Sequence, residues 1–269
     1  MKTFATVLSL ILFVSCASSK ETKYTASTPA GAIVRSFLGI SMTDSIDFIR
    51  WKLTLTDLKY SLECNYGMGK PNTNGFYDGG KKVSFSGAVK WDNTTNTYRL
   101  QNGKHALTLI ELNSNLLHIL NNDHRLLIGG GGWSYALNNM APSATSQSKL
   151  RATQSTFRDS IAFQGRTPCG GLNVNKSNEC YKLKWYLVLY SNNTYKILGT
   201  AYRAEGGKKG SWRTVVSKDG RIAYQLSDEN GKPILHLLKL DEGILIFTDE
   251  KGNLLVGDHD FSYTLNRKF

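Results

Sequence analysis

The sequence is poor in the residues on which catalysis and metal binding most often depend. It has five histidines, four cysteines and four methionines among 269 residues. Neither a His-x-x-x-His nor a Gly-x-Ser-x-Gly motif is present, and these would mark a zinc protease or a serine hydrolase. Met42 and Met68 are too far apart for a methionine-rich copper site. We therefore expect that the chain is not an enzyme.

Long apolar runs are also absent, apart from one at the start of the chain. Residues 1–15, MKTFATVLSLILFVS, have one lysine and then an apolar run too short to span a bilayer, which is typical of a secretory signal peptide. The segment from Phe13 to Ser19 resembles a bacterial lipobox, in which cleavage before Cys16 exposes a cysteine that becomes lipid-modified. The alternative is an ordinary secreted protein with a stray early cysteine.

A lipid on Cys16 would attach the protein to a membrane. Acyl chains contribute about 0.8 kcal/mol of membrane binding per buried CH₂, so several chains on one residue give lasting attachment. The next residue is Ala17 rather than Asp, which is compatible with sorting to the outer membrane. We therefore expect a lipid-anchored protein of the bacterial cell envelope, at the outer membrane.

The charge balance is basic but diffuse. The chain has 33 Lys and Arg against 21 Asp and Glu, a formal net charge of +12. Such a surface can attract anionic lipid, lipopolysaccharide or nucleic acid through its long-range field. Because an exported protein tied to a membrane does not meet nucleic acid, and because the basic residues are scattered, we expect no nucleic-acid partner.

One stretch of the chain occurs twice. Residues 102–138 and residues 230–266 align without a gap at a displacement of 128 residues, and 14 of the 37 positions are identical. A repeat of this length predicts two copies of one domain. None of the five histidines recurs at the equivalent position of the other copy, so surface or strand positions are the simpler interpretation of each.

Within each copy, short segments alternate apolar and polar residues and are separated by turn residues, the pattern of antiparallel strands. Trp51 in copy one and Trp185 in copy two occupy matching strands, each expected to face the core. The pairs Asn102-Gly103 and Asn230-Gly231 predict hairpins. Seven to eight short strands per copy favour a small up-and-down barrel or a strongly coiled sheet, because closure removes exposed edges.

These patterns divide the chain into five parts. After the signal peptide, residues 16–36 are rich in small polar residues and predict a flexible, lipidated tether. The first barrel is expected at residues 37–139, a linker at 140–160 and the second barrel at 161–269.

Three cysteines remain besides Cys16. Cys169 and Cys180 bracket a polar, glycine-containing loop, and an oxidising compartment permits a disulfide between them. The alternatives are free thiols that bind a soft metal such as Cu(I), or thiols without a role. Cys64 lies in a strand-like segment, where we expect it to be a small buried hydrophobe.

The start of copy two resembles a known family. The segment from Phe163 to Leu172, FQGRTPCGGL, with the later Gly210-Ser211-Trp212, is similar to the N-terminal domain of the NlpE lipoproteins. These are outer-membrane lipoproteins linked to copper tolerance, adhesion sensing and envelope stress, and the resemblance implies a small lipocalin-like barrel. The family usually has a Cys-x-x-Cys pair, and here Leu172 stands where its second cysteine would be. This departure weakens the implied copper role.

The sequence thus predicts a non-enzymatic binding or sensing module of two lipocalin-like barrels, with an NlpE-like role in copper homeostasis or envelope stress. Copper is the one cofactor that the resemblance suggests. The alternatives are a carrier of a small hydrophobic ligand in a barrel, or an adhesive or structural lipoprotein with an envelope protein partner.

The preserved repeat itself is expected to be structural. Its leucines and tyrosines alternate at strand period, its polar residues are expected at turns, and Tyr135 and Tyr263 are expected to close the barrels. Function is expected where the copies differ, in the cysteine loop of copy two and around Thr43 to Asp47 of copy one.

Overall fold

The structure is a computed structural model of the chain, and it describes residues 21–71, 73, 75–144, 146–152, 156–172, 174 and 180–269. The predicted signal peptide, residues 1–15, and the predicted lipidation site Cys16 lie outside the described residues. Within the described ranges, no helix has the length and apolar character needed to cross a membrane.

The first barrel has eight strands, each paired antiparallel to the next along the chain. The last strand then pairs with the first, through Thr25 opposite Asn138, and this pairing closes the barrel. The strands are β1 (Thr22–Thr28), β2 (Phe48–Leu55), β3 (Lys59–Gly67), β4 (Lys81–Asp92), β5 (Thr97–Asn102), β6 (His105–Asn113), β7 (Leu116–Ile119) and β8 (Ala136–Asn139).

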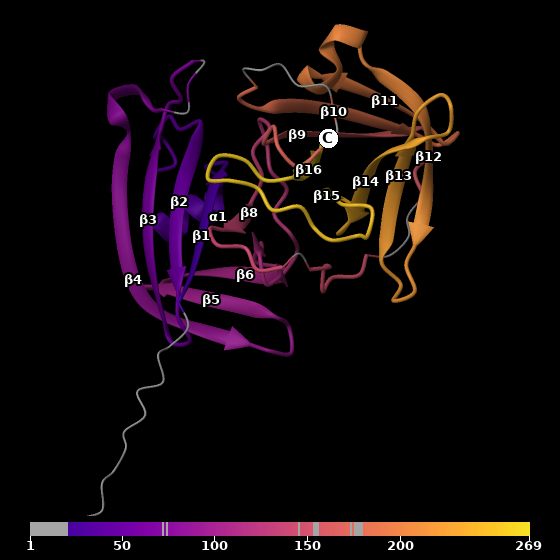
Figure 1. The fold of residues 1–269 in the computed structure, drawn as a ribbon. Coiled ribbons are helices and arrows are strands. Elements are labelled where there is room, and N and C mark those ends of the chain that lie inside the picture. Colours follow the sequence, from indigo (N-terminus) through magenta and orange to yellow (C-terminus); the bar gives the residue numbers. More distant parts are fainter. Residues whose placement is uncertain are drawn as a thin grey trace, which may run out of the picture.

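The second barrel repeats this arrangement, and Gln164 of its first strand lies opposite Asn266 of its last. The two all-β barrels in tandem, predicted from the repeat, are therefore confirmed (Figure 1). The strands are β9 (Ser160–Thr167), β10 (Leu183–Tyr190), β11 (Thr194–Gly199), β12 (Lys208–Val216), β13 (Ile222–Ser227), β14 (Pro233–Lys239), β15 (Ile244–Thr248) and β16 (Thr264–Arg267).

Alternating burial shows how the strands fill the barrels. In β2, Trp51, Leu53 and Leu55 are buried, whereas Lys52 between them is exposed. Successive side chains of a strand face opposite sides of the sheet, so this period places the apolar residues inside the barrel. Side chains thus occupy the interior, with Trp51 fully buried.

Two hairpins form where Asn-Gly pairs predicted them. Gly103 has φ 55° between β5 and β6, and Gly231 has φ 78° between β13 and β14. Positive φ is strained for residues with a Cβ, so glycine is suited to these two turns.

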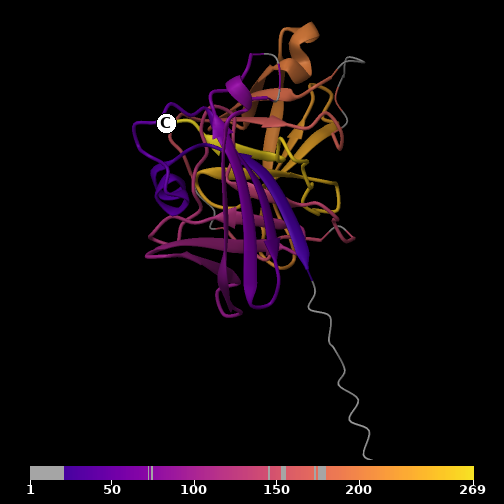
Figure 2. The same ribbon diagram turned by 90° about the vertical axis from the view of Figure 1, so that its left-hand side faces the viewer.

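The tether prediction is wrong over residues 22–36, because this segment belongs to the first barrel. Tyr24 and Ala26 of β1 are buried, and β1 pairs with both β2 and β8. The helix α1 (Ala32–Leu38) follows β1 and buries Phe37. Figure 2 shows this helix beside the strands of the first barrel. The many polar residues of this segment do not show the alternation typical of a strand, so the strand was not predicted. The barrel needs this strand to close.

The second barrel holds the cysteine loop at the place equivalent to α1. Both segments follow a Thr-Pro pair, Thr28-Pro29 after β1 and Thr167-Pro168 after β9, and both precede the second strand of their barrel. Leu172 of the cysteine loop packs into the core of the second barrel. Each barrel therefore carries an insertion between its first two strands.

The linker predicted at residues 140–160 agrees with the strand ends, since β8 ends at Asn139 and β9 begins at Ser160. Its described residues pack between the barrels. The backbone amide of Lys149 donates to the carbonyl of Leu112 at 2.7 Å, and the amide of Leu254 donates to the carbonyl of Ser146 at 3.2 Å. The linker therefore contacts both barrels.

A third apolar cluster lies outside the two barrel interiors and joins them. It contains equivalent residues of the two copies, such as Leu112 with Leu240 and Leu126 with Leu254. Contacts made by the same positions of two similar units are the mark of an isologous, two-fold interface. The two barrels therefore pack like the halves of a symmetric dimer within one chain.

Candidate functional site

The best-preserved part of the repeat builds the interface between the barrels. Ser134 and Ser262, which are equivalent residues, lie opposite each other with their hydroxyl oxygens 2.6 Å apart. Both are buried. The two hydroxyls therefore mark the position of the approximate two-fold axis.

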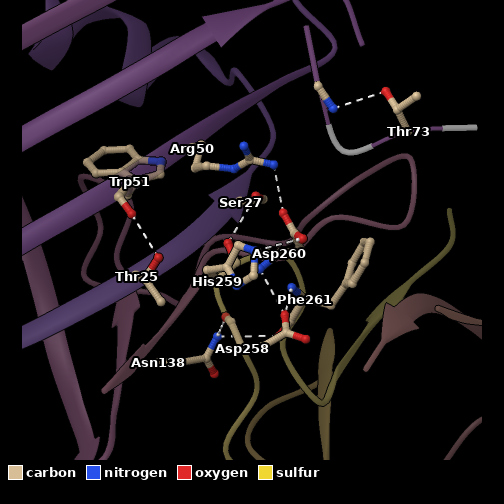
Figure 3. A network of polar contacts seen from close by, with 11 residues as sticks. Thr25, Ser27, Arg50, Trp51, Thr73, Asn138, Asp258, His259, Asp260 and Phe261 are labelled. Atoms are coloured by element: carbon tan, nitrogen blue, oxygen red, sulfur yellow. Dashed lines mark hydrogen bonds and ion pairs between the residues drawn. The ribbon is translucent and has the colours of Figure 1, made fainter. Parts of the chain in front are cut away.

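Two asparagines make the same contacts from opposite sides of this axis. The amide of Gly257 donates to Asn138 Oδ1 at 2.9 Å, and the amide of Gly129 donates to Asn266 Oδ1 at 2.7 Å. Asn138 Nδ2 also donates to the carbonyl of Asp258 at 2.9 Å (Figure 3). Both asparagine side chains are 1% exposed. The expectation that the polar residues of the repeat lie at turns is therefore wrong for these residues.

The interface places one loop of each copy against the other barrel, and these loops differ. In copy two the loop after Gly257 has three polar residues, Asp258, His259 and Asp260, and it reaches the first barrel (Figure 1). In copy one the equivalent residues 130–132 are all glycine. The same interface thus carries an acidic loop on one side and a loop without side chains on the other.

The acidic loop is held by direct polar contacts with the first barrel. Asp260 accepts a hydrogen bond and ion pair from Arg50 at 2.7 Å, and Ser27 Oγ donates to the carbonyl of His259 at 3.4 Å (Figure 3). Asp258 Oδ1 accepts from the amides of Asp260 and Phe261 and so holds the turn. This side of the interface is closed by protein groups.

The glycine loop borders a cavity of about 620 Å³ between the barrels. Asp47, from the segment before β2, and Lys182, from the segment before β10, line it together with Arg166 of β9. Other lining residues are Pro29, Ala30, Gly31, Ile46, Phe48, Gly69, Lys70, Pro71, Thr73, Gly130, Gly131 and Trp133.

Arg166 is the central charged group of this cavity. Its guanidinium carbon lies 4.8 Å from the centroid of the Trp133 ring, a cation–π contact. In the described part of the chain, no acceptor forms a hydrogen bond or ion pair with it. Gly132 packs so closely that an added Cβ would lie 2.7 Å from Arg166 Nε. The glycine at this position therefore makes room for the arginine.

Burial destabilises the positive charges of this cavity. It lowers the pKa of Arg166, with the Tyr181 and Asp47 charges opposing the shift. Burial also lowers the pKa of Lys182, and the neighbouring Arg166 and Lys184 lower it further, while Asp260 opposes them. Desolvation and like charges both disfavour a cation, so a bound anion would relieve both costs.

Aromatic rings form the wall behind the arginine. Trp133 stacks on Phe48, with ring centroids 4.5 Å apart, and on Phe261, with centroids 5.4 Å apart. Phe48 also stacks on Phe76 at 4.4 Å. Stacked rings at such distances add packing energy and hold each other in place, so Trp133 is a fixed wall of the cavity.

The structure joins Cys169 and Cys180 in a disulfide, with Cα atoms 6.0 Å apart, which is an ordinary spacing for such a bond. This agrees with one of the three possibilities raised by the sequence, and a disulfide leaves no thiolate for a metal. Among the described residues, no group of three or more His, Cys, Asp or Glu is arranged to hold a metal. Cys64 is a buried free cysteine.

The four residues expected to be structural lie in the barrels. Trp51 Nε1 donates to Thr28 Oγ1 at 2.8 Å, and Trp185 Nε1 donates to the equivalent Oγ1 of the second barrel at 2.9 Å. Tyr135 contacts the backbone of the segment before α1, and Tyr263 Oη donates to a carbonyl of the cysteine loop. Each tyrosine thus links the residues just before the last strand of its barrel to the segment that follows the first strand.

Sequence reasoning missed Arg166, Lys182 and the glycine loop as one group. One of the two segments in which function was expected borders the cavity, through Asp47, and Lys182 lies two residues after Cys180, the end of the other segment. One sequence signal could have indicated this site. Residues 130–132 are all glycine, whereas the equivalent residues 258–260 of the matched repeat are polar.

The fold defines the class of protein: two up-and-down antiparallel eight-stranded barrels joined by an approximate two-fold interface. No model of a known protein family, no curated protein and no solved structure matches the chain.

Proposed function

We propose that the protein is a non-enzymatic binding module of the bacterial envelope, anchored by a lipid on Cys16, which takes its ligand between its two barrels. The observation that supports this most is the cavity beside Arg166, because an arginine that forms no hydrogen bond or ion pair with the described residues lines it. Concave sites with a few convergent polar groups, often at the junction of two domains, are the usual places for small ligands.

The barrel interiors favour this site over a carrier of the lipocalin type. Trp51 and Trp185, which would line a ligand cavity in a carrier, are 0% and 3% exposed and pack with other core side chains. An eight-stranded barrel either is filled by its side chains or holds one small ligand. Filled interiors leave the space between the barrels as the better candidate.

An NlpE-like role in envelope-stress sensing is compatible with this proposal, and the membrane location rests on the lipobox-like segment around Cys16. Copper binding by Cys169 and Cys180 would first require reduction of their disulfide, because the thiolate is the metal ligand. Copper titration of oxidised and reduced protein separates these cases. Binding by the oxidised protein would point to ligands other than these cysteines.

The proposal is tested by asking what the protein carries when it is taken from the envelope. The Cys16→Ala chain is released without its anchor, and native mass spectrometry measures any bound small molecule. Gly130→Trp is the blocking variant, because Gly130 lines the cavity and an added Cβ there meets no atom within 4 Å, so the position has room for a large side chain. A ligand bound by the parent chain and lost in the blocked variant supports the proposal. A ligand retained by the blocked variant would place binding elsewhere.

The anchor is tested separately. Labelling with a radioactive fatty acid is expected for the unaltered chain and not for Cys16→Ala, and the variant is expected in the soluble fraction. Labelling that persists in the variant would exclude Cys16 as the lipid site.

A further inference from the structure

The two barrels present equivalent pairs of residues to the loops that face them. Ser27 of β1 lies opposite Arg50 of β2, and Arg166 of β9 lies opposite Lys184 of β10. Each pair sits one residue before the hydrogen-bonded Thr-Trp contact of its barrel. One pair therefore carries a single positive charge, and the other carries two.

The facing loops do not balance these charges equally. Asp260 meets Arg50 at 2.7 Å in the first barrel. The residue equivalent to Asp260 is Gly132, which faces Arg166 and has no side chain. The barrel with more positive charge thus faces the loop without a carboxylate. The ion pair at Arg50 shows what this interface position accepts: a negatively charged oxygen beside a guanidinium.

Several hydrogen-bond donors around the cavity have no acceptor in the described part of the chain. They are the Arg166 guanidinium and the backbone amides of Gly130 and Gly131, and these three residues line the cavity. Lys182 adds an ammonium group whose ring contact with Tyr181, at 4.8 Å, leaves its hydrogen-bonding capacity available to an anion. Guanidinium, ammonium and backbone amide groups are the donors that bind phosphate in proteins.

The charge of the lining residues indicates which anion fits. Lys70, Arg166 and Lys182 stand against the single carboxylate Asp47, which leaves a net charge of +2. Asp47 is itself engaged, because its Oδ2 accepts from the amide of Gly69 at 2.6 Å. A phosphate monoester carries a charge of about −1.5 to −2 at neutral pH, whereas a simple carboxylate carries one negative charge.

We propose that the cavity beside the glycine loop binds a phosphate group, either free or as the monoester of a small molecule, held by Arg166, Lys182 and the amides of Gly130 and Gly131. This rests on the proposed function, since it names the chemistry of the ligand for the same site. The phosphate supplies, at the second barrel, the negative charge that the Asp260 carboxylate supplies at the first. Its source is a free phosphate ion or an esterified small molecule, and the two are separated by the test.

The test follows ligand binding by NMR on the full chain with Cys16→Ala, using glucose 1-phosphate, inorganic phosphate, glucuronate and glucose as probes. We expect the amide resonances of Gly130 and Gly131 and the Nε–H resonance of Arg166 to shift with the two phosphates. Glucose 1-phosphate binding more tightly than inorganic phosphate indicates an ester, and the reverse indicates the free ion.

The decisive variants are Gly130→Asp and its neutral control Gly130→Asn. The position has open space and no positive φ, so both side chains fit. The aspartate places an internal carboxylate in the cavity and competes with phosphate, and we expect affinity for glucose 1-phosphate to fall at least tenfold. The asparagine is expected to change it less than threefold. Arg166→Gln is expected to weaken binding about tenfold. Lys218→Gln, which changes an exposed residue between β12 and β13 that does not line the cavity, is expected to leave binding within twofold.

Each other outcome overturns the inference in a distinct way. If glucose bound as tightly as glucose 1-phosphate, the site would not select anions. The proposal that the protein is a binding module would be unaffected. If glucuronate bound as tightly as glucose 1-phosphate, the site would not prefer a dianion over a single negative charge, and the phosphate proposal would be rejected. Equal loss in the aspartate and asparagine variants would reject charge competition. Absence of any shift would reject phosphate at this site, while the mass measurement with Gly130→Trp decides the proposed function independently.

Discussion

Replacing Asn138 by alanine tests whether the repeated residues hold the two barrels together. The side chain is 1% exposed, and it accepts from the amide of Gly257 at 2.9 Å and donates to the carbonyl of Asp258 at 2.9 Å. Alanine leaves both backbone groups without these partners inside the interface. A buried polar group without a partner costs about 1 to 3 kcal/mol. Because Gly257 is half-buried and water can reach part of it, we take the low end for each group and expect a loss of about 2 to 4 kcal/mol in the free energy of unfolding.

Urea unfolding followed by tryptophan fluorescence measures this loss, since Trp133 stacks in the interface and Trp51 and Trp185 lie in the two barrel cores. The matched control is Asn139→Ala, the next residue of β8, whose side-chain hydrogen bonds are exposed and whose loss should cost less than about 1 kcal/mol. A loss for Asn138→Ala no greater than that of the control would refute the role of this residue.

Three further changes test other parts of the structure. Trp51→Phe removes the Nε1 donor of a buried hydrogen bond to Thr28, and urea unfolding should show a loss of about 1 to 2 kcal/mol; an unchanged midpoint would mean that the indole makes no net contribution. Reduction of the disulfide between Cys169 and Cys180, 11 residues apart, should lower the free energy of unfolding by about 2 to 3 kcal/mol in the chain-entropy description. The measurement is the fall in Tm on adding a phosphine reductant. The Tm of the double variant Cys169→Ser/Cys180→Ser should not change with the reductant. Burial lowers the pKa of His118 from 6.5 to about 4. As the pH falls, the unfolded chain therefore binds a proton at this residue before the folded chain does. The neutral imidazole contributes about 3 kcal/mol to the free energy of unfolding, which is fully present above pH 6.5 and is lost as the pH falls toward 4. His118→Gln should remove that share of the pH dependence of the urea midpoint, and an unaltered dependence would contradict it.

Much of the barrel architecture can be predicted because it depends on local patterns. The alternation around Trp51 and Trp185 has the period of a strand, and Asn-Gly pairs predict turns from backbone chemistry alone. β1 was missed because most residues of Thr22–Thr28 are polar and lack a clear apolar alternation, and its pairing with β2 and β8 gives several of them a buried position. The position of that strand is a property of the closed barrel.

The interface and the candidate site are harder to predict for a different reason. An asparagine at the end of an apolar segment has the same local sequence signal whether it lies in a turn or makes a buried contact, so Asn138 and Asn266, which lie in β8 and β16, were expected at turns. Arg166 gains its surroundings from Trp133 and Asp47, which lie far away in the sequence. No local pattern contains such a contact, although the loss of side chains at residues 130–132 marks where the copies differ.

The cavity beside the glycine loop exists because the two barrels carry different facing loops. In a symmetric dimer every contact occurs twice, so a change that opened a cavity at one loop would open it at both. Here both halves lie on one chain, and the Asn138 and Asn266 contacts keep the common interface while the facing loops differ. Asp260 closes one side with an ion pair to Arg50, whereas on the other side Gly132 packs against Arg166 and the adjacent Gly130 and Gly131 border the cavity. A duplicated chain can therefore keep the contacts of a two-fold interface while its two facing loops differ, and we propose that the cavity beside the glycine loop binds an anion on one side alone.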